Sequence, residues 1–271
     1  MEVNISTNPH RRGECPHCKA TLLVDALYCG KCGHSISHAS NSRGFDNFIT
    51  SEQESPWRCI SPALGLWVAL LAINGLLGLA GHLFDISSPF FDLGAQGISA
   101  LFILILCFKD RKQIKPLLCR FGYRGLLSYV EIIGALIFLS IFMWLYFKIA
   151  SIIGIEKLPN LEEFIDHNWS IWSAIALICI MPGIFEELAF RGYIMARLLK
   201  VSNNREALIL QAAMFSILHM LPAVFISHFV IGIILGALRL RSKSIYPGIL
   251  VHTGWNALVI LIEAYQIGTI G

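Results

Sequence analysis

The chain has 271 residues, of which 55% are hydrophobic and only 14% are charged, and its formal net charge is +3. This composition is far from that of a soluble globular protein and indicates a protein embedded in a lipid bilayer. The small net charge gives no argument for a nucleic-acid partner, so the position of charges along the chain is more informative than their total.

The amino-terminal stretch MEVNISTNPHRRGECPHC contains no apolar run of the length found in signal peptides. We therefore expect that it is not a cleaved secretory leader and that it lies in the cytoplasm.

Four of the eight cysteines form two C-x2-C pairs near the amino terminus, Cys15 with Cys18 and Cys29 with Cys32. Each pair can present two thiolates on a tight turn, and four thiolates complete a tetrahedral zinc site without an open position for catalysis. The stretch between the pairs is typical of a short hairpin. We predict a structural zinc ribbon over residues 1–36, with no identifiable partner; disulfides or redox pairs are the alternative, disfavoured in a reducing cytoplasm.

Residues 37–60 are polar and predict a flexible linker, whereas residues 61–271 consist of long apolar runs. A helix needs about 20 apolar residues to cross a bilayer. The predicted fold class is therefore all-α, a polytopic transmembrane helical bundle of seven to eight spans preceded by the zinc ribbon. The seven spans that we count are 63–84, 90–108, 126–149, 169–190, 206–221, 223–238 and 246–265.

Charges between the predicted spans alternate along the chain. The loops after the second, fourth and sixth spans are basic, the loop after the first has no Lys or Arg, and the loop after the third is mostly acidic. Because cytoplasmic loops retain Lys and Arg, this pattern places the amino terminus inside and the carboxyl terminus outside. We expect an integral protein of the bacterial inner (plasma) membrane. We find no internal repeat of the kind that marks many transporters.

Several ionisable or strongly polar side chains fall within the predicted spans. Such a group costs on the order of 3 kcal/mol at the middle of a membrane helix, so each needs a partner or a function. These residues are Glu186, Glu187, Arg191, His219, His252 and Asn256.

The spacing of these residues predicts how they meet. Glu187 and Arg191 share a helix face at i and i+4, whereas Glu186 is rotated by about 100° and points elsewhere. If the fourth and fifth spans form a hairpin that turns near residues 200–205, Glu186 and His219 are equally far from the turn and lie at matching depth.

The seventh span begins at the same basic side and carries His252 and Asn256 on one face. We expect it to bring both side chains to a comparable depth, in a water-filled cavity opened by a kink at Pro182-Gly183.

Three motifs follow one another on these spans: EExxxR in EELAFR, FxxxH in FSILH and HxxxN in HTGWN. In motif order and placement, residues 169–265 resemble the CAAX prenyl endopeptidase and bacteriocin-processing family of membrane proteins. The resemblance implies a helical-bundle intramembrane protease. The zinc ribbon is not part of the core pattern of that family, whose members usually have eight spans.

The resemblance also implies roles for the polar residues. Glu186 would be the general base that activates a water for attack on a peptide carbonyl, and His219 and His252 would hold that water or a metal. Asn256 would donate a hydrogen bond to the developing oxyanion.

Glu187 and Arg191 would fix the helix, although a buried ion pair often only satisfies itself. Glu186, His219 and His252 are possible ligands of a catalytic zinc, but the chain has no HExxH motif, and we favour a glutamate-activated water without metal.

The leading hypothesis is an intramembrane endopeptidase acting on a membrane-associated protein or peptide. A catalytically silent bacteriocin-immunity or interaction protein and a transporter are the alternatives. We assign no direct role to His82, His228 or Cys179, which are typical of packed or interfacial residues.

We predict that Cys15→Ser releases zinc and increases proteolysis of residues 1–36, because three thiolates no longer complete the site. The helical bundle should stay in the membrane fraction, since the linker separates the two parts. Zinc analysis, limited proteolysis and membrane extraction check this prediction, and loss of the bundle from the membrane would show that the division into two parts is wrong.

Overall fold

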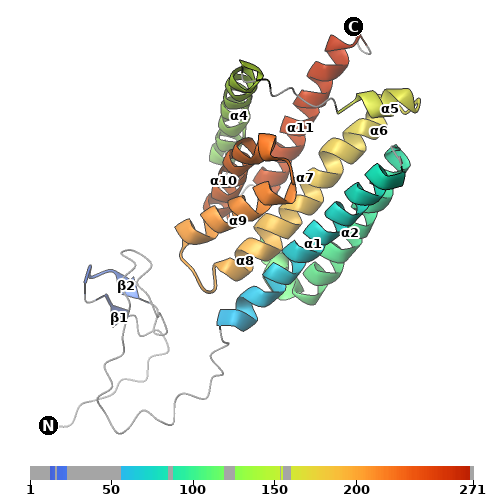
Figure 1. Ribbon diagram of the computed structural model, residues 1–271. Coiled ribbons are helices and arrows are strands. Elements are labelled where there is room, and N and C mark those ends of the chain that lie inside the picture. The colour runs from blue at the N-terminus through green and yellow to red at the C-terminus, as the bar shows by residue number, and fades with distance from the viewer. Residues whose placement is uncertain are drawn as a thin grey trace, which may run out of the picture. The chain divides into compact units, whose positions relative to one another are not determined.

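The computed structural model describes residues 13–15, 17–22, 56–84, 88–118, 126–152, 154 and 160–268. It divides into two compact units, Met1–Glu54 and Ser55–Gly271, and the second unit is all-helical over its described residues (Figure 1). The elements are β1 (Gly13–Glu14), β2 (Thr21–Leu22), α1 (Pro56–Phe84), α2 (Pro89–Lys109), α3 (Arg111–Leu118), α4 (Leu126–Ile152), α5 (Glu162–Asp166), α6 (Ile171–Ala174), η1 (Ile175–Ile180), α7 (Met181–Glu186), η2 (Glu187–Ile194), α8 (Met195–Leu198), α9 (Asn204–Leu218), η3 (Pro222–Val224), α10 (Phe225–Ser242) and α11 (Tyr246–Gln266).

In the first unit, β1 pairs antiparallel with β2, and the turn between them carries the first cysteine pair. The backbone N–H of Cys15 donates to the carbonyl of Ala20 at 2.8 Å, which closes the turn around Cys18. Cys29 and Cys32 lie outside the described residues, as do most residues of the hairpin expected between the two pairs. Structural zinc therefore stays a prediction.

Among the described residues, six helices are long and apolar enough to cross a membrane: Pro56–Phe84, Pro89–Lys109, Leu127–Ile152, Ile171–Leu198, Pro222–Ser242 and Tyr246–Gln266. They correspond to six of the seven predicted spans. The expected fifth span, 206–221, is instead the 15-residue helix α9. At 1.5 Å per residue α9 is roughly 22 Å long, which is shorter than the hydrocarbon core of about 30 Å.

Helix α1 begins at Pro56, inside the stretch 37–60 that was expected to be a flexible linker. Proline is favoured at the first position of a helix, where its missing N–H removes no hydrogen bond. Residues 37–55 lie outside the described part of the chain, so the flexible linker stays a prediction for them.

The fourth span is one continuous helix built from α-helical and π-helical segments. Two π-helical segments, η1 and η2, flank α7, and π-helical turns occur frequently at functional sites. Pro182 in α7 has no N–H to donate to the carbonyl of Ile178, four residues earlier, so the regular α-helical ladder is interrupted at this point. This interruption lies one turn before the two glutamates.

Helices α9 and α10 form a tight antiparallel pair. Asn203 and Glu206 make a capping box that starts α9 after the turn that follows α8, where the sequence predicted a hairpin turn. A Cβ built on Gly232 of α10 would lie 2.8 Å from the Cα of Ala212 in α9, so only glycine permits this approach.

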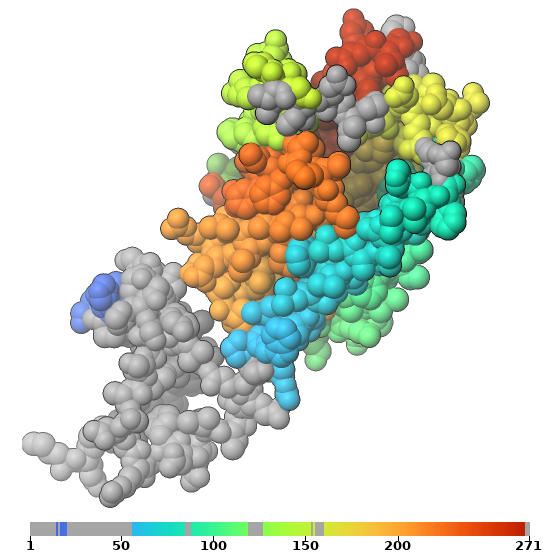
Figure 2. Space-filling model, in the orientation of Figure 1, coloured from blue at the N-terminus to red at the C-terminus, as the bar shows by residue number. Residues whose placement is uncertain are grey.

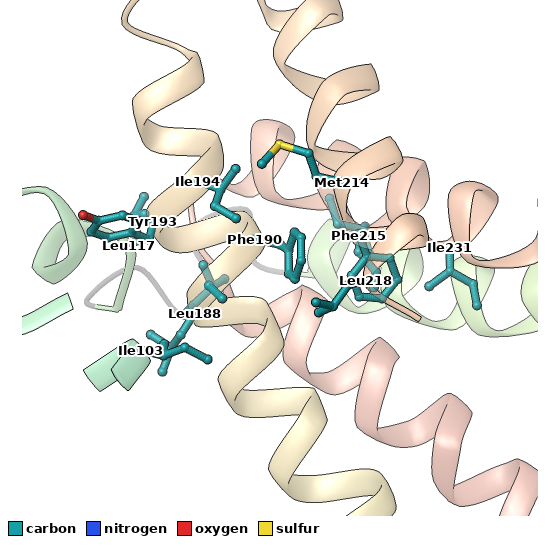
Figure 3. Packing of buried hydrophobic residues seen from close by; sticks show 14 of the residues in the cluster. Ile103, Leu117, Leu188, Phe190, Tyr193, Ile194, Met214, Phe215, Leu218 and Ile231 are labelled. Carbon is teal, nitrogen blue, oxygen red and sulfur yellow. The ribbon is translucent and has the colours of Figure 1, made fainter. Parts of the chain in front are cut away.

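A hydrophobic core joins the helices around the fourth span. Figure 3 shows Phe190 between Leu188 and Ile194 of the same span and the side chains of Phe215 and Leu218 of α9. The rings of Phe190 and Phe215 meet edge to face at a centroid distance of 5.2 Å. On the face seen in Figure 2, α1 lies beside α8 and α9. The core thus fixes α9 against the span that carries the glutamates.

We predict that Gly232→Val destabilises the bundle, because the added side chain collides with the backbone of Ala212 and overpacking costs about 1–3 kcal/mol. Thermal unfolding of the purified protein in detergent measures the change. Gly78→Val is the matched control, since a Cβ at Gly78 meets no atom within 4 Å. Equal melting temperatures for the two variants would contradict the close packing of α9 on α10.

Candidate active site

A cavity of about 880 Å³ lies among α4, α7, α9, α10 and α11. Four of the six predicted site residues line it, namely Glu186, His219, His252 and Asn256. The other two, Glu187 and Arg191, are fully buried behind it. Three segments that are distant in sequence therefore bring one carboxylate, two imidazoles and one amide to the same cavity. The sequence spacing predicted that these side chains lie at matching depth.

Glu187 is the centre of a buried ionic network. Its Oε1 accepts a hydrogen bond from Arg191 Nη1 at 2.7 Å, and both side chains are 0% exposed. The same oxygen lies 3.2 Å from His252 Nδ1. The guanidinium of Arg191 also lies 4.5 Å from the centroid of the Phe215 ring, which adds a cation–π contact. The network ties the fourth span to α9 and α11.

Glu187 also determines the orientation of His252. A carboxylate oxygen can only accept, so Nδ1 of His252 carries the hydrogen, and the neutral ring has its lone pair on Nε2. That Nε2 lies 3.9 Å from Oε2 of Glu186. Two atoms at this separation can each lie about 2.8 Å from one water placed beside them. The pair is therefore arranged to hold a water between an acid and an imidazole.

Glu186 differs from its neighbour in its exposure and its contacts: Glu187 is 0% exposed and binds Arg191 and His252 through Oε1, whereas Glu186 faces the cavity. Its Oε2 is buried and makes no hydrogen bond to any described residue, although 26% of the side chain is exposed to the cavity. An unpaired buried carboxylate is costly, and such groups are retained where they have a function. The geometry thus separates a fully buried glutamate held by Arg191 and His252, Glu187, from one that lines the cavity, Glu186.

Asn256 is held by the backbone of the fourth span. Its Nδ2 donates to the carbonyl of Ile178 at 2.9 Å, the carbonyl that Pro182 cannot reach with an N–H of its own. A side-chain amide has two N–H groups, so one remains available to the cavity. The oxyanion-donor role implied by the family resemblance stays a prediction, and the hydrogen bond to Ile178 fixes the position of the amide.

His228 lines the same cavity, although the sequence analysis gave it no direct role. Its ring centroid lies 3.8 Å from that of His219. The sequence signal that was missed is the turn at Pro222. His219 lies three residues before this proline and His228 six residues after it, so the two rings meet across the α9–α10 hairpin. By contrast, His82 is exposed at the end of α1, and Cys179 is fully buried.

The turn that follows His219 is held by two hydrogen bonds to backbone carbonyls. The hydroxyl of Tyr146 in α4 donates to the carbonyl of Ala223, and the hydroxyl of Ser216 donates to that of Phe225. These bonds connect the end of α9 to α4 and to the start of α10. They fix the wall of the cavity at the point where α9 stops.

The polar side chains around the cavity do not form a metal site. Throughout the described residues, no group of three or more His, Cys, Asp and Glu side chains is arranged to hold a metal ion. The glutamate oxygens and the imidazole nitrogens do not converge on one point. Nε2 of His252 is 3.9 Å from Oε2 of Glu186, and Nδ1 of the same ring is bound to Oε1 of Glu187. As these side chains stand, they do not fit a three-ligand zinc site.

Six candidate spans and a cavity lined by a few polar side chains among apolar ones define a polytopic integral membrane protein with a site inside its bundle. A family model described as Type II CAAX prenyl endopeptidase Rce1-like matches residues 168–258, roughly a third of the chain. The matched segment holds all six predicted polar residues of the site, and over it the chain is similar to a family of membrane-embedded proteases. No curated protein and no solved structure matches the chain significantly.

We predict that Gly248→Ala destabilises the protein by disrupting the Glu187 network, because a Cβ at Gly248 would overlap Oε2 of Glu187. Gly254→Ala is the control, since its Cβ would make only ordinary contact, 3.6 Å from Leu136. Both changes replace glycine by alanine in α11, so both gain about 1 kcal/mol of helix propensity.

The expected result is a lower melting temperature for Gly248→Ala than for Gly254→Ala, because the free energy of unfolding differs by about 1–3 kcal/mol. Thermal unfolding in detergent measures it. A similar gain in stability for both variants would show that Glu187 has room to move and that the network is not tightly packed.

Proposed function

We propose that this chain is an intramembrane endopeptidase that hydrolyses a peptide bond of a membrane-associated protein or peptide. The observation that carries the proposal is the carboxylate of Glu186 at the cavity, with Oε2 3.9 Å from Nε2 of His252 and without a hydrogen bond to any described residue. The similarity of residues 168–258 to an endopeptidase family supports the same reaction class.

In the proposed mechanism, Glu186 accepts a proton from a water that lies between its carboxylate and His252 Nε2. The water oxygen forms a bond to the carbonyl carbon of the substrate, and the carbonyl oxygen becomes an oxyanion. The carbon–nitrogen bond then breaks, and Glu186 returns the proton to the leaving nitrogen. One water is consumed, and the products are a carboxylate and an amine.

Other residues of the cavity support these steps. The second N–H of Asn256 is the donor that we assign to the oxyanion, because its first N–H is held by Ile178. The Nδ1 of His219 donates to the carbonyl of Phe215 at 3.0 Å, so its Nε2 carries a lone pair that can accept a hydrogen bond within the cavity. Glu187 and Arg191 act through His252, whose ring they orient.

The substrate class follows from the location of the site. The cavity lies among helices that are long and apolar enough to cross a membrane, so a scissile bond reaches it from the membrane. The basic loops that follow α2 and α8 favour the cytoplasmic side for those ends and for the amino terminus. The description of the matching family makes a prenylated-cysteine peptide a suitable first substrate to test.

We predict that Glu186→Gln lowers the rate of cleavage by about 10²–10⁴-fold, the usual contribution of a general base, because an amide cannot accept the proton of the water. The measurement is mass spectrometry of newly formed peptide termini in membranes from cells that express the full chain. Termini that depend on the wild-type chain should disappear in the variant at equal expression.

Glu162→Gln is the matched control, since Glu162 is an exposed glutamate of α5 outside the cavity. It should give the wild-type set of termini. If wild type and Glu186→Gln yield the same termini, or if wild type yields none of its own, the endopeptidase proposal fails and the interaction-protein hypothesis gains support.

A further inference from the structure

His228 and His219 form a closely contacting pair of imidazoles on the wall of the cavity. The ring centroids are 3.8 Å apart, and the ring planes are inclined by 42°. Both residues line the cavity, and they come from different helices, His219 from the end of α9 and His228 from the first turn of α10. The contact therefore depends on the turn that joins these helices.

Each ring of the pair is also held at one nitrogen. Nδ1 of His219 lies 3.0 Å from the carbonyl of Phe215, and Nδ1 of His228 lies 2.9 Å from the carbonyl of Val224. Because a carbonyl can only accept, each Nδ1 carries a hydrogen and donates it. In a neutral ring the lone pair is then on Nε2.

One hydrogen bond does not fix the plane of an imidazole, because the second side-chain torsion of histidine is broad. The ring of Phe215 contacts His219 edge to face, with a centroid distance of 5.0 Å. His228 supplies a second aromatic contact to the same ring. Together the two neighbours restrict rotation of His219 about the bond that leads to its ring.

We propose that His228 is a positioning residue for the cleavage reaction, which holds the ring of His219 by an inclined ring contact so that the lone pair on Nε2 of His219 keeps one orientation within the cavity. The proposal rests on the proposed function and adds to it a residue that lies outside the three sequence motifs. His228 acts through His219, so what matters in its side chain is the flat ring and not the nitrogen atoms.

This reasoning predicts an order of activities for variants of His228. His228→Ala removes the ring and should lower kcat by about three- to tenfold, the range expected for one aromatic contact, while KM changes by less than about twofold. His228→Phe keeps a flat ring and should retain kcat within about twofold of wild type. His228→Gln keeps polarity without a ring and should resemble His228→Ala.

His167→Ala is the control for the kinetic series. His167 also donates from Nδ1 to a carbonyl four residues earlier, that of Glu163 at 2.9 Å, but it is exposed and does not line the cavity. It should leave kcat unchanged. The substrate is a peptide that spans a cleavage site found in the terminus profile, added to the full chain in liposomes.

Two kinetic outcomes would overturn the proposal. If His228→Gln is active and His228→Phe is not, a polar contact of His228 and not its ring is required. If His228→Ala retains wild-type kcat, the contact has no role in the reaction.

A second measurement does not depend on cleavage, and so separates failure of this inference from failure of the endopeptidase proposal. The full chain, labelled with ¹⁵N in its histidine rings, is studied by NMR in lipid nanodiscs at about pH 8, where a free imidazole is neutral. The signals of His219 are assigned by their loss in His219→Gln.

Wild type and His228→Phe should show one tautomer of His219, protonated at Nδ1, and His228→Ala should show broadened or averaged signals. Identical His219 signals in wild type and in His228→Ala would overturn the positioning role even if the chain cleaves its substrate.

Discussion

The buried carboxylate of Glu187 is the interaction on which the site depends. One oxygen of this side chain binds the guanidinium of Arg191 and the imidazole of His252, and neither glutamate nor arginine is exposed. Removing Glu187 or Arg191 would leave the other charge buried without compensation, which costs several kcal/mol. The network therefore locks three helices into one register, and in that register Glu186 and His252 meet at the cavity.

Much of this arrangement could be predicted because it follows from local rules. The i, i+4 spacing of Glu187 and Arg191 predicted their ion pair, and the rotation of Glu186 away from them predicted its separate environment. Equal distances from the α8–α9 turn predicted that Glu186 and His219 line one cavity. The six polar residues were identified as candidates because polar groups are costly to bury in a bilayer.

The remainder depends on tertiary packing that periodicity does not encode. Asn256 binds the carbonyl of Ile178 because α11 packs on the fourth span where Pro182 interrupts its ladder. His228 meets His219 only because the turn at Pro222 folds α10 back on α9. The same turn ends α9 early, so the stretch 206–221, predicted as the fifth of seven spans, is too short to be one.

The size of the cavity has a consequence for the supply of the second reactant. At about 30 Å³ per molecule, a space of about 880 Å³ has the volume of on the order of thirty waters, although side chains such as Leu177, Ile231 and Ile260 make most of its wall apolar. Hydrocarbon is a dry solvent, and a hydrolase surrounded by it would otherwise wait for each molecule to diffuse in. Under the proposed reaction, the cavity has room for water beside Glu186, so delivery of the polypeptide and not space for the nucleophile would be the slower supply.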